Sequence, residues 1–409
     1  MCIRDSIQAL LGNRQGLALS IDPATLEPID DDVEAYALFD RLLGADFYAR
    51  LRDTLEQAGG YRLAQPGVAI TQPGRRYYVF PYDWRQDNVR SAQKLDALIE
   101  QIRRDHRDPA LKVDVVAHSM GGLILRYYLR YGARDVLGDN ELRIDYAGVA
   151  KVRAAILLGT PNLGSVNALH GFITGTEVGY RAVPPEVAAT LPSTYQLFPH
   201  PLHEWLVTAD GRALARDLYE PQIWRAFQWS VFDPAVRRRV RERYASREAA
   251  EQALALMERY FEHRLQRARR FVWSITRQLD ESPERLIVFG GNCEPTPARL
   301  LVEEIDGESM VRLRPQDVVS ASDPGRVERA MVEPGDGVVT KASLLGREQL
   351  DSTRPRHRYA YFPLAWSLFL CESHSRLTGN PSFQDNLLDA LLSYERRFDQ
   401  RPVQPQVQP

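Results

Sequence analysis

The chain has 409 residues, of which 44% are hydrophobic and 26% are charged, and 52 Lys and Arg against 54 Asp and Glu leave a net charge of −2. This ordinary globular composition excludes long disorder and fibrous folds, and the balanced charge gives no general attraction to nucleic acid. Three Cys are too few for a disulfide scaffold, and the longest apolar stretch, residues 361–371, is too short to span a bilayer.

The first six residues, MCIRDS, match the in-frame reading of a transposase adapter used in sequencing libraries. We therefore interpret residues 1–6 as an artefact and expect the native gene to be cut at its 5′ end. On this interpretation Cys2 is not native, and Cys293 and Cys371 are too few for an argument about redox chemistry. The absence of a signal peptide then carries no weight, so cytoplasmic and secreted locations both stay open.

The first half of the chain alternates β-rich runs with amphipathic stretches. Residues 76–84 (RYYVFPYDW) and 112–118 (KVDVVAH) indicate strands, and residues 88–106 carry apolar side chains at helical spacing. A second helix is predicted for residues 121–131. A third strand is predicted for residues 152–160, whose near-continuous apolar run is typical of a strand covered on both faces. The alternation predicts an α/β protein with a mostly parallel central sheet and flanking helices.

The pattern changes after the third strand. Residues 168–284 contain Pro-rich turns and then a long helical stretch from about residue 234 to 278, and we interpret them as a largely helical insertion over the C-terminal edge of the sheet. Two further strands are predicted at residues 285–290 (RLIVFG) and 367–371 (SLFLC), and a hairpin is predicted around Asp306-Gly307.

Residues 236–243 of this insertion (VRRRVRER) are strongly basic. A solvated helix face is the simpler interpretation and the one we favour. The alternative is a patch that meets anionic lipid head groups, through which the insertion would contact a membrane peripherally.

The strongest local motif is residues 115–122 (VVAHSMGG), in which a predicted strand runs into Ser119 and a predicted helix follows it. This is the nucleophile-elbow pattern G-x-S-x-G, with Ala117 at the first glycine position and Gly121 at the second. The tight turn requires small residues at both positions. Ser119 would project at a helix N-terminus, where the backbone N–H of Met120 is the natural first oxyanion donor. A serine that only caps the helix is the competing interpretation.

A serine nucleophile needs a base and an orienting carboxylate, and in this fold the chain order is Ser, acid, His. His374 follows the apolar run SLFLC, which places it on a loop at the end of a strand, whereas the side chain of His118 is expected to face away from Ser119. Asp336 lies between two glycines in a turn (PGDGVV) that leaves its carboxylate free to reach a partner, with Asp317 and Asp323 as competitors.

Six segments together resemble the lecithin:cholesterol acyltransferase family, in its bacterial type. They occur in the family's order and cover about residues 60–392: AHSMGG around Ser119, YYVFPYDWR (77–85), LLGTPNLGS (157–165), PSTYQLFP (192–199), GDGV (335–338) and HSRLTGNPSFQDNL (374–387). The resemblance implies an α/β-hydrolase fold with a lipid-facing cap. It also implies Ser119 as the acyl-accepting nucleophile, Asp336 as the orienting acid and His374 as the base.

The chain departs from the family in two ways. Ala117 replaces the first glycine of the elbow, which is harmless on steric grounds. Family members also begin with a strand and a short Pro-Gly loop that supplies the second oxyanion N–H, and residues 7–30 resemble the stretch just after it. We therefore expect the first strand to be missing and the following division: artefact 1–6, first part of the core 7–167, helical cap 168–284, second part of the core 285–395 and a Pro/Gln-rich disordered tail 396–409.

The resemblance implies acyl transfer from a phospholipid-type ester, through an acyl-enzyme on Ser119, to an alcohol acceptor. A lipase or esterase that uses water has the same triad, so the sequence does not separate the two. A non-catalytic lipid-binding protein of the same fold is the third alternative. The sequence has no metal-ligand cluster, P-loop or dinucleotide fingerprint, and we expect no cofactor, no metal and no nucleic-acid partner.

Overall fold

The computed structural model describes residues 14–31, 33, 35, 37–38, 41–42, 45–139, 141–178, 181–277, 282–319, 323–347 and 362–398. The predicted artefact 1–6 and most of the predicted tail 396–409 lie outside these residues. Helix α13 (Pro381–Phe398) continues into the start of that tail.

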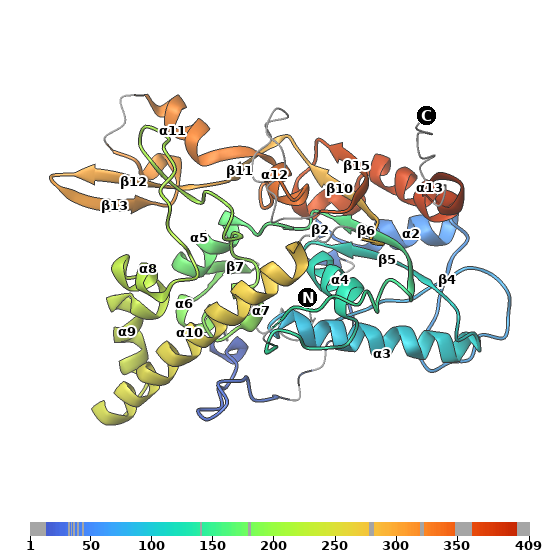
Figure 1. Cartoon of the computed structure of the whole chain (residues 1–409), viewed down its shortest axis with the longest axis horizontal. Helices are drawn as coiled ribbons and strands as arrows, with labels where there is room; N and C mark the ends of the chain where they lie inside the picture. Colours follow the sequence, from blue (N-terminus) through green and yellow to red (C-terminus); the bar gives the residue numbers. More distant parts are fainter. Residues whose placement is uncertain are drawn as a thin grey trace, which may run out of the picture.

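Within the described residues, four parallel strands form the central sheet (Figure 1). Their order across the sheet is β15 (Leu364–Leu370), β10 (Leu286–Gly291), β6 (Val152–Leu158) and β5 (Val113–His118). These strands lie where the sequence predicts them, within a few residues at each end. The predicted mostly parallel α/β sheet is therefore confirmed.

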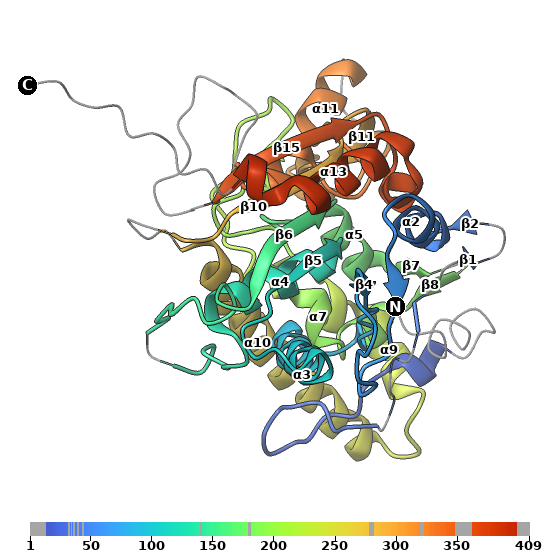
Figure 2. The ribbon, with the colours of Figure 1, turned by 90° about the vertical axis from the view of Figure 1, so that its right-hand side faces the viewer.

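Apolar residues cover both faces of this sheet. Along β6, Ala155 and Leu157 join the larger core cluster, whereas Ala154, Ile156 and Leu158 join the smaller one. The larger cluster is shared with α3 (Asn88–His106), α4 (Met120–Tyr131) and α10 (Arg247–Thr276), and the smaller one with α13 and α2 (Ala49–Asp53). Figure 2 shows these two groups of helices on opposite sides of the sheet. Two covered faces explain why the strands read as continuous apolar runs rather than alternating ones.

One predicted strand is much shorter than the sequence suggests. Of residues 76–84, only β4 (Arg76–Tyr77) is a strand, and it pairs in parallel with β3 (Arg62–Leu63). The chain turns at residues 84–86, where the buried guanidinium of Arg85 folds back onto the carboxylate of Asp83 (Nε to Oδ1 3.0 Å). Four of the aromatic residues that suggested a strand line a cavity beside β5 instead: Tyr77, Tyr78, Phe80 and Tyr82.

The segment between β6 and β10 is mostly helical. The predicted helical stretch 234–278 is two helices, α9 (Pro234–Arg241) and α10, because Ser246 caps the start of α10 by accepting a hydrogen bond from Ala249 N (3.2 Å). The other elements of this segment are α5 (Val166–Thr174), β7 (Thr176–Val178), β8 (Arg181–Val183), α6 (Pro185–Ala188), α7 (Pro192–Tyr195), β9 (Leu206–Thr208) and α8 (Pro221–Ala226).

The predicted hairpin around Asp306-Gly307 is confirmed. It joins β12 (Leu300–Ile305) to β13 (Glu308–Arg312), and both turn residues have the positive φ (52° and 83°) that a tight two-residue hairpin turn requires. The remaining elements of the second half are β11 (Glu294–Pro297), α11 (Pro324–Met331), β14 (Val332–Gly335) and α12 (Lys341–Leu344). No helix within the described ranges combines the length and the apolarity that crossing a membrane requires.

A buried ion pair fixes α4 against the end of α10. The Arg130 guanidinium donates to Glu284 Oε2 from Nη2 (3.0 Å) and to the backbone oxygen of Ser274 from Nη1 (3.0 Å). The side chains of Arg130 and Glu284 are 1% and 0% exposed. Removing one member of a buried pair leaves the other charge without compensation, which is far costlier than loss of an exposed pair.

We predict that Glu284→Ala lowers the free energy of unfolding by about 3–5 kcal/mol, because it leaves the Arg130 charge without a compensating charge in the core. Asp30→Ala is the control, since Asp30 pairs with Arg90 at the surface (side chains 64% and 41% exposed). The control should change stability by less than about 1 kcal/mol. Equal effects in chemical denaturation would contradict the assignment.

Candidate active site

Strand β5 ends in a strained turn at Ser119. This residue has φ 55° and ψ −128°, a conformation that L-residues other than glycine rarely adopt, and α4 begins at the next residue. Two hydrogen bonds hold the turn: Ser119 N donates to Leu158 O of β6 (2.8 Å) and Gly122 N donates to Ser119 O (3.0 Å). The strand–turn–helix geometry of a nucleophile elbow is therefore present, and it presents Ser119 at the N-terminus of α4.

The steric demand of this turn lies one residue further along than the sequence suggests. A Cβ added to Gly121 would make only ordinary contacts, 3.7 Å to Tyr82 Oη and 3.9 Å to Ala117 Cβ. A Cβ added to Gly122 would lie 2.0 Å from Thr160 Oγ1 and 2.8 Å from Thr160 Cβ. The prediction that Gly121 must be small is thus not supported by these contacts, whereas Gly122 is required for α4 to pack against the end of β6.

Asp336 is held in a turn that both flanking glycines permit. A Cβ on Gly335 would lie 2.3 Å from Val339 O, and Gly337 has φ 88°. Asp336 Oδ1 accepts hydrogen bonds from Val338 N (3.0 Å) and Val339 N (2.7 Å), which leaves Oδ2 for another partner.

His374 contacts both of the other predicted residues. Its Nδ1 lies 2.8 Å from Asp336 Oδ2, and its Nε2 lies 2.9 Å from Ser119 Oγ. Because a carboxylate only accepts, Nδ1–H donates to Asp336, and Nε2 is left to accept from the Ser119 hydroxyl. The structure therefore brings together the three side chains that the sequence singles out, although they are far apart in the chain.

Two further contacts complete this arrangement. His374 N donates to Asp336 O (2.8 Å), so the loops of acid and base are joined through the backbone as well. Gly159, at the end of β6, lies directly beside them, since a Cβ there would be 3.1 Å from both Asp336 Oδ2 and His374 Nδ1. Met120 is the first residue of α4, so its N–H belongs to the positive end of that helix, next to Ser119.

The competing acids and histidines have other partners. Asp317 accepts from Arg314 N (3.1 Å), and Asp323 caps α11 by accepting from Arg326 N (3.2 Å). His357 lies outside the described residues. The described histidines away from the site bond to neighbours of their own: His106 to Tyr78, His170 to Arg314, His200 to Thr276, His203 to Ala298 O, and His263 to Glu27.

Sequence reasoning missed the role of His118. Tyr48 Oη donates to His118 Nδ1 (2.9 Å), His118 Nε2–H donates to His374 O (3.3 Å), and the two imidazole rings lie 4.9 Å apart. Desolvation, followed by the nearby His374, lowers the pKa of His118 to about 3, so the ring is neutral with one donor and one acceptor. Tyr48 lies in a stretch without a motif, so no sequence signal pointed to this chain of contacts.

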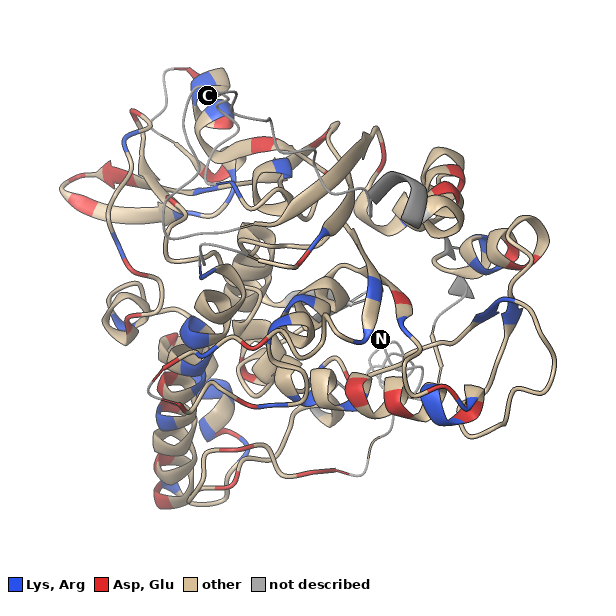
Figure 3. Cartoon of the chain, turned by 45° about the vertical axis from the view of Figure 1, so that its right-hand side comes forward, with Lys and Arg blue, Asp and Glu red and all other residues tan. Residues whose placement is uncertain are grey.

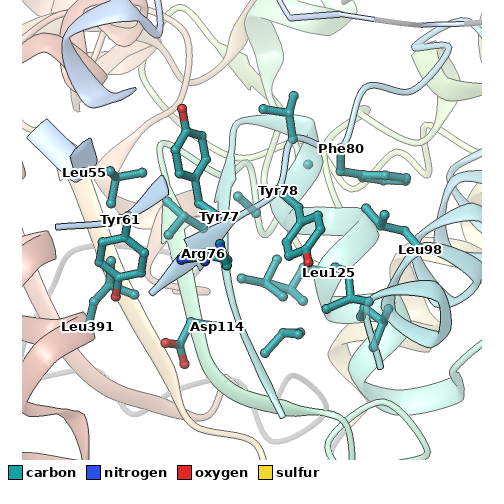
Figure 4. Close-up of a pocket in the computed structure, with 18 of the residues that line it drawn as sticks. Leu55, Tyr61, Arg76, Tyr77, Tyr78, Phe80, Leu98, Asp114, Leu125 and Leu391 are labelled. Carbon is teal, nitrogen blue, oxygen red and sulfur yellow. The ribbon is translucent and has the colours of Figure 1, made fainter. Parts of the chain in front are cut away.

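A cavity of about 630 Å³ lies between β4 and β5, beside the elbow. Figure 4 shows Arg76, Tyr77 and Tyr78 on one wall and Asp114 of β5 on another. Every residue of β5 lines it, and among the described strands β5 pairs only with β6. One wall is therefore a strand edge whose N–H and C=O groups need hydrogen-bond partners, which an acyl chain would not supply.

Four of the five arginines in the basic run 236–243 form ion pairs within the molecule. Glutamates of α6 and α10 surround it, and Figure 3 shows acidic and basic residues interleaved along α10. The pairs are Arg237–Glu258, Arg239–Glu186 (2.8 Å), Arg241–Glu251 (2.8 Å) and Arg243–Glu186 (2.8 Å). These contacts favour the solvated helix face over a patch reserved for anionic lipid. Within the described ranges, no group of three or more His, Cys, Asp or Glu side chains is arranged to hold a metal ion.

Gly121 and Gly122 are adjacent but differ in the space around them, so they form a matched pair of substitutions. Gly122→Ala should lower the free energy of unfolding by about 1–3 kcal/mol, because the methyl group overlaps the Thr160 side chain. Gly121→Ala adds the same methyl group one residue earlier and should change stability by less than about 0.5 kcal/mol. Thermal unfolding of the two variants side by side checks this, and a more destabilised Gly121→Ala would refute it.

Comparisons with known proteins show the family to which the chain belongs. Two solved structures resemble it weakly: a Tle4-Tli4 complex (13% identity, TM-score 0.49, covering 93% of this chain and 75% of that one) and EstA from Clostridium botulinum (14% identity, TM-score 0.33, covering 95% and 97%). No curated protein matches. The sequence model of the lecithin:cholesterol acyltransferase family matches residues 71–344. This range contains Ser119 and Asp336 and ends before His374. The chain therefore belongs to the lecithin:cholesterol acyltransferase family of α/β-hydrolases, a membership that supports a lipid acyltransferase or hydrolase without determining the acyl acceptor.

Proposed function

We propose that the protein is a serine-dependent acyltransferase that acts on lipid esters, with Ser119 as nucleophile, His374 as base and Asp336 as orienting acid. The observation that carries the proposal is the hydrogen-bonded chain from Ser119 Oγ to His374 Nε2 (2.9 Å) and from His374 Nδ1 to Asp336 Oδ2 (2.8 Å). This hydrogen-bonded chain lies at the C-terminal end of β5, where the nucleophile elbow begins. The protein also belongs to an acyltransferase family. A serine that served only as a helix cap would need neither partner.

The geometry suits nucleophilic catalysis. His374 Nε2 takes the Ser119 proton as Oγ attacks the ester carbonyl, and the same proton then goes to the departing alcohol, which leaves an acyl-enzyme. Asp336 Oδ2 holds the imidazole in the tautomer that keeps Nε2 able to accept. The Met120 N–H, at the N-terminal end of α4, stabilises the developing oxyanion. A second alcohol or water then takes the acyl group by the reverse sequence.

The substrate class rests on family membership. A phospholipid-type ester as acyl donor agrees with the family, and we propose that residues 168–284 act as a cap under which the lipid reaches Ser119. Three of the four arginines of α9, Arg237, Arg239 and Arg241, form ion pairs with glutamates of the same protein. Contact with a lipid surface would therefore not depend on that helix.

Substitution of the three residues tests the proposal. Ser119→Ala and His374→Ala should each lower kcat for ester turnover by about 10⁶-fold, as removal of such groups does in a serine protease. Asp336→Asn should lower it by about 10⁴-fold, because an amide favours the wrong tautomer of His374. Asp317→Asn is the matched control and should leave kcat unchanged, since Asp317 bonds only within its own turn. Retained turnover in any of the first three variants would overturn the role of that residue.

The ratio of new ester to free acid among the products distinguishes an acyltransferase from a hydrolase. With a labelled lipid ester and a sterol or other long-chain alcohol, an acyltransferase should form labelled new ester in excess of free acid. A lipase or esterase with the same triad would release mainly free acid, because water then accepts the acyl group. Absence of both products, together with no reaction of Ser119 with a serine-directed phosphonate, would favour the non-catalytic alternative.

A further inference from the structure

Cys293 and Cys371 form a disulfide beside the site, a pairing that no sequence pattern predicted. Their Cα atoms are 5.0 Å apart, and they are separated by 78 positions in the chain. Cys293 follows the end of β10 and Cys371 follows the end of β15, so the bond links two adjacent parallel strands at the edge where Ser119 also lies. Both cysteines are exposed.

Cys293, one of the two cysteines, is connected through β11 to the loop that carries Asp336. Cys293 precedes β11, whose first residue, Glu294, pairs with Gly335 of β14 and bridges to Asp336 itself. Thr296 of β11 accepts a hydrogen bond from Gly337 N (2.9 Å). Movement of Cys293 would therefore be transmitted to the turn that holds the Asp336 carboxylate.

Cys371, the other cysteine, is close in the chain to the proposed base, His374. Cys371 lies three positions before His374, and the intervening segment packs tightly on the end of β10. A Cβ on Gly291 would lie 2.3 Å from Glu372 O and 2.6 Å from Asp336 Cβ, and Asn292 N donates to Leu370 O (3.1 Å). The three loop segments meet around Gly291, and the disulfide closes them covalently on the solvent side.

We propose that the Cys293–Cys371 disulfide is a redox-sensitive positioning element for His374. With the bond formed, the imidazole is held within reach of both Ser119 and Asp336, and reduction of the bond releases the loop and lowers turnover. The inference rests on the proposed function, since it assigns the disulfide to the same site. It implies that the protein is most active where disulfides form and less active among reducing thiols.

The chemistry is thiol–disulfide exchange with a thiol reductant. A thiolate of the reductant attacks one exposed sulfur and releases the other cysteine as a thiolate, and a second thiol of the reductant resolves the mixed disulfide. The protein gains two electrons and two protons, and the reductant becomes a disulfide. Oxidation reverses the change without altering any other group of the site.

Kinetics of the oxidised and reduced protein test this proposal. A Cys2→Ser background leaves only the pair of interest, and ester turnover is measured before and after reduction with dithiothreitol. Reduction should lower kcat by about 10-fold or more and change KM by less than about twofold, because displacement of a catalytic group by about 1 Å can cost up to 100-fold in rate. Re-oxidation should restore kcat.

The double variant Cys293→Ser/Cys371→Ser is the matched control. It should have the low kcat of the reduced protein, and dithiothreitol and re-oxidation should leave it unchanged. In the double variant and in the reduced protein, labelling of Ser119 by a serine-directed phosphonate should be slower, as kcat is lower. Circular dichroism at the assay temperature should be the same in all forms.

The outcomes separate the inference from the proposed function. If the oxidised protein turns over ester no faster than Ser119→Ala, the proposed function fails. If Ser119→Ala is inactive but the reduced and oxidised proteins have the same kcat, only the inference fails. Loss of the circular dichroism signal together with activity would also overturn it, since the bond would then support the whole fold rather than the position of His374.

Discussion

The backbone conformation of Ser119 is the constraint on which the rest of the site depends. A left-handed φ at a non-glycine residue persists only where its surroundings enforce it. Here the enforcement comes from the bond to Leu158 O in β6 and from α4, which starts at the next residue and packs closely against Thr160 through Gly122. The strain directs the hydroxyl away from the sheet and toward the histidine on the β15 loop.

The parallel sheet explains how residues so distant in sequence meet. The carboxyl ends of β5, β6, β10 and β15 share one edge, and these strands lead into Ser119, Gly159, Cys293 and His374 in turn. Asp336 arrives by a different route, since β11 continues from β10 and pairs with β14, which ends beside the acid. The imidazole of His374 then lies beside the neutral ring of His118, with the ring centroids 4.9 Å apart, and the loop that carries it begins at Cys371 of the disulfide.

Features encoded locally were predictable from the sequence. The bounds of α3 follow from the spacing of its apolar residues, and Ser119, Asp336 and His374 each stand in a short pattern with a physical reason for its residue types. Features that depend on tertiary contacts were not. The aromatic run after Arg76 looks like a strand, but only Arg76–Tyr77 pairs with a neighbouring strand, and the residues after it line a cavity. The steric role of Gly122 depends on Thr160, which lies on another strand's loop, and the partnership of Tyr48 with His118 leaves no trace in the sequence.

Direct detection of the acyl-enzyme is the sharpest test of Ser119 as the nucleophile. The protein is mixed with a lipid ester, quenched with acid within the first turnover and digested for mass spectrometry. If Ser119 is the nucleophile, one acyl adduct is expected, on the peptide that contains Ser119, and none in Ser119→Ala. An adduct on another residue, or ester turnover without any adduct, would contradict it.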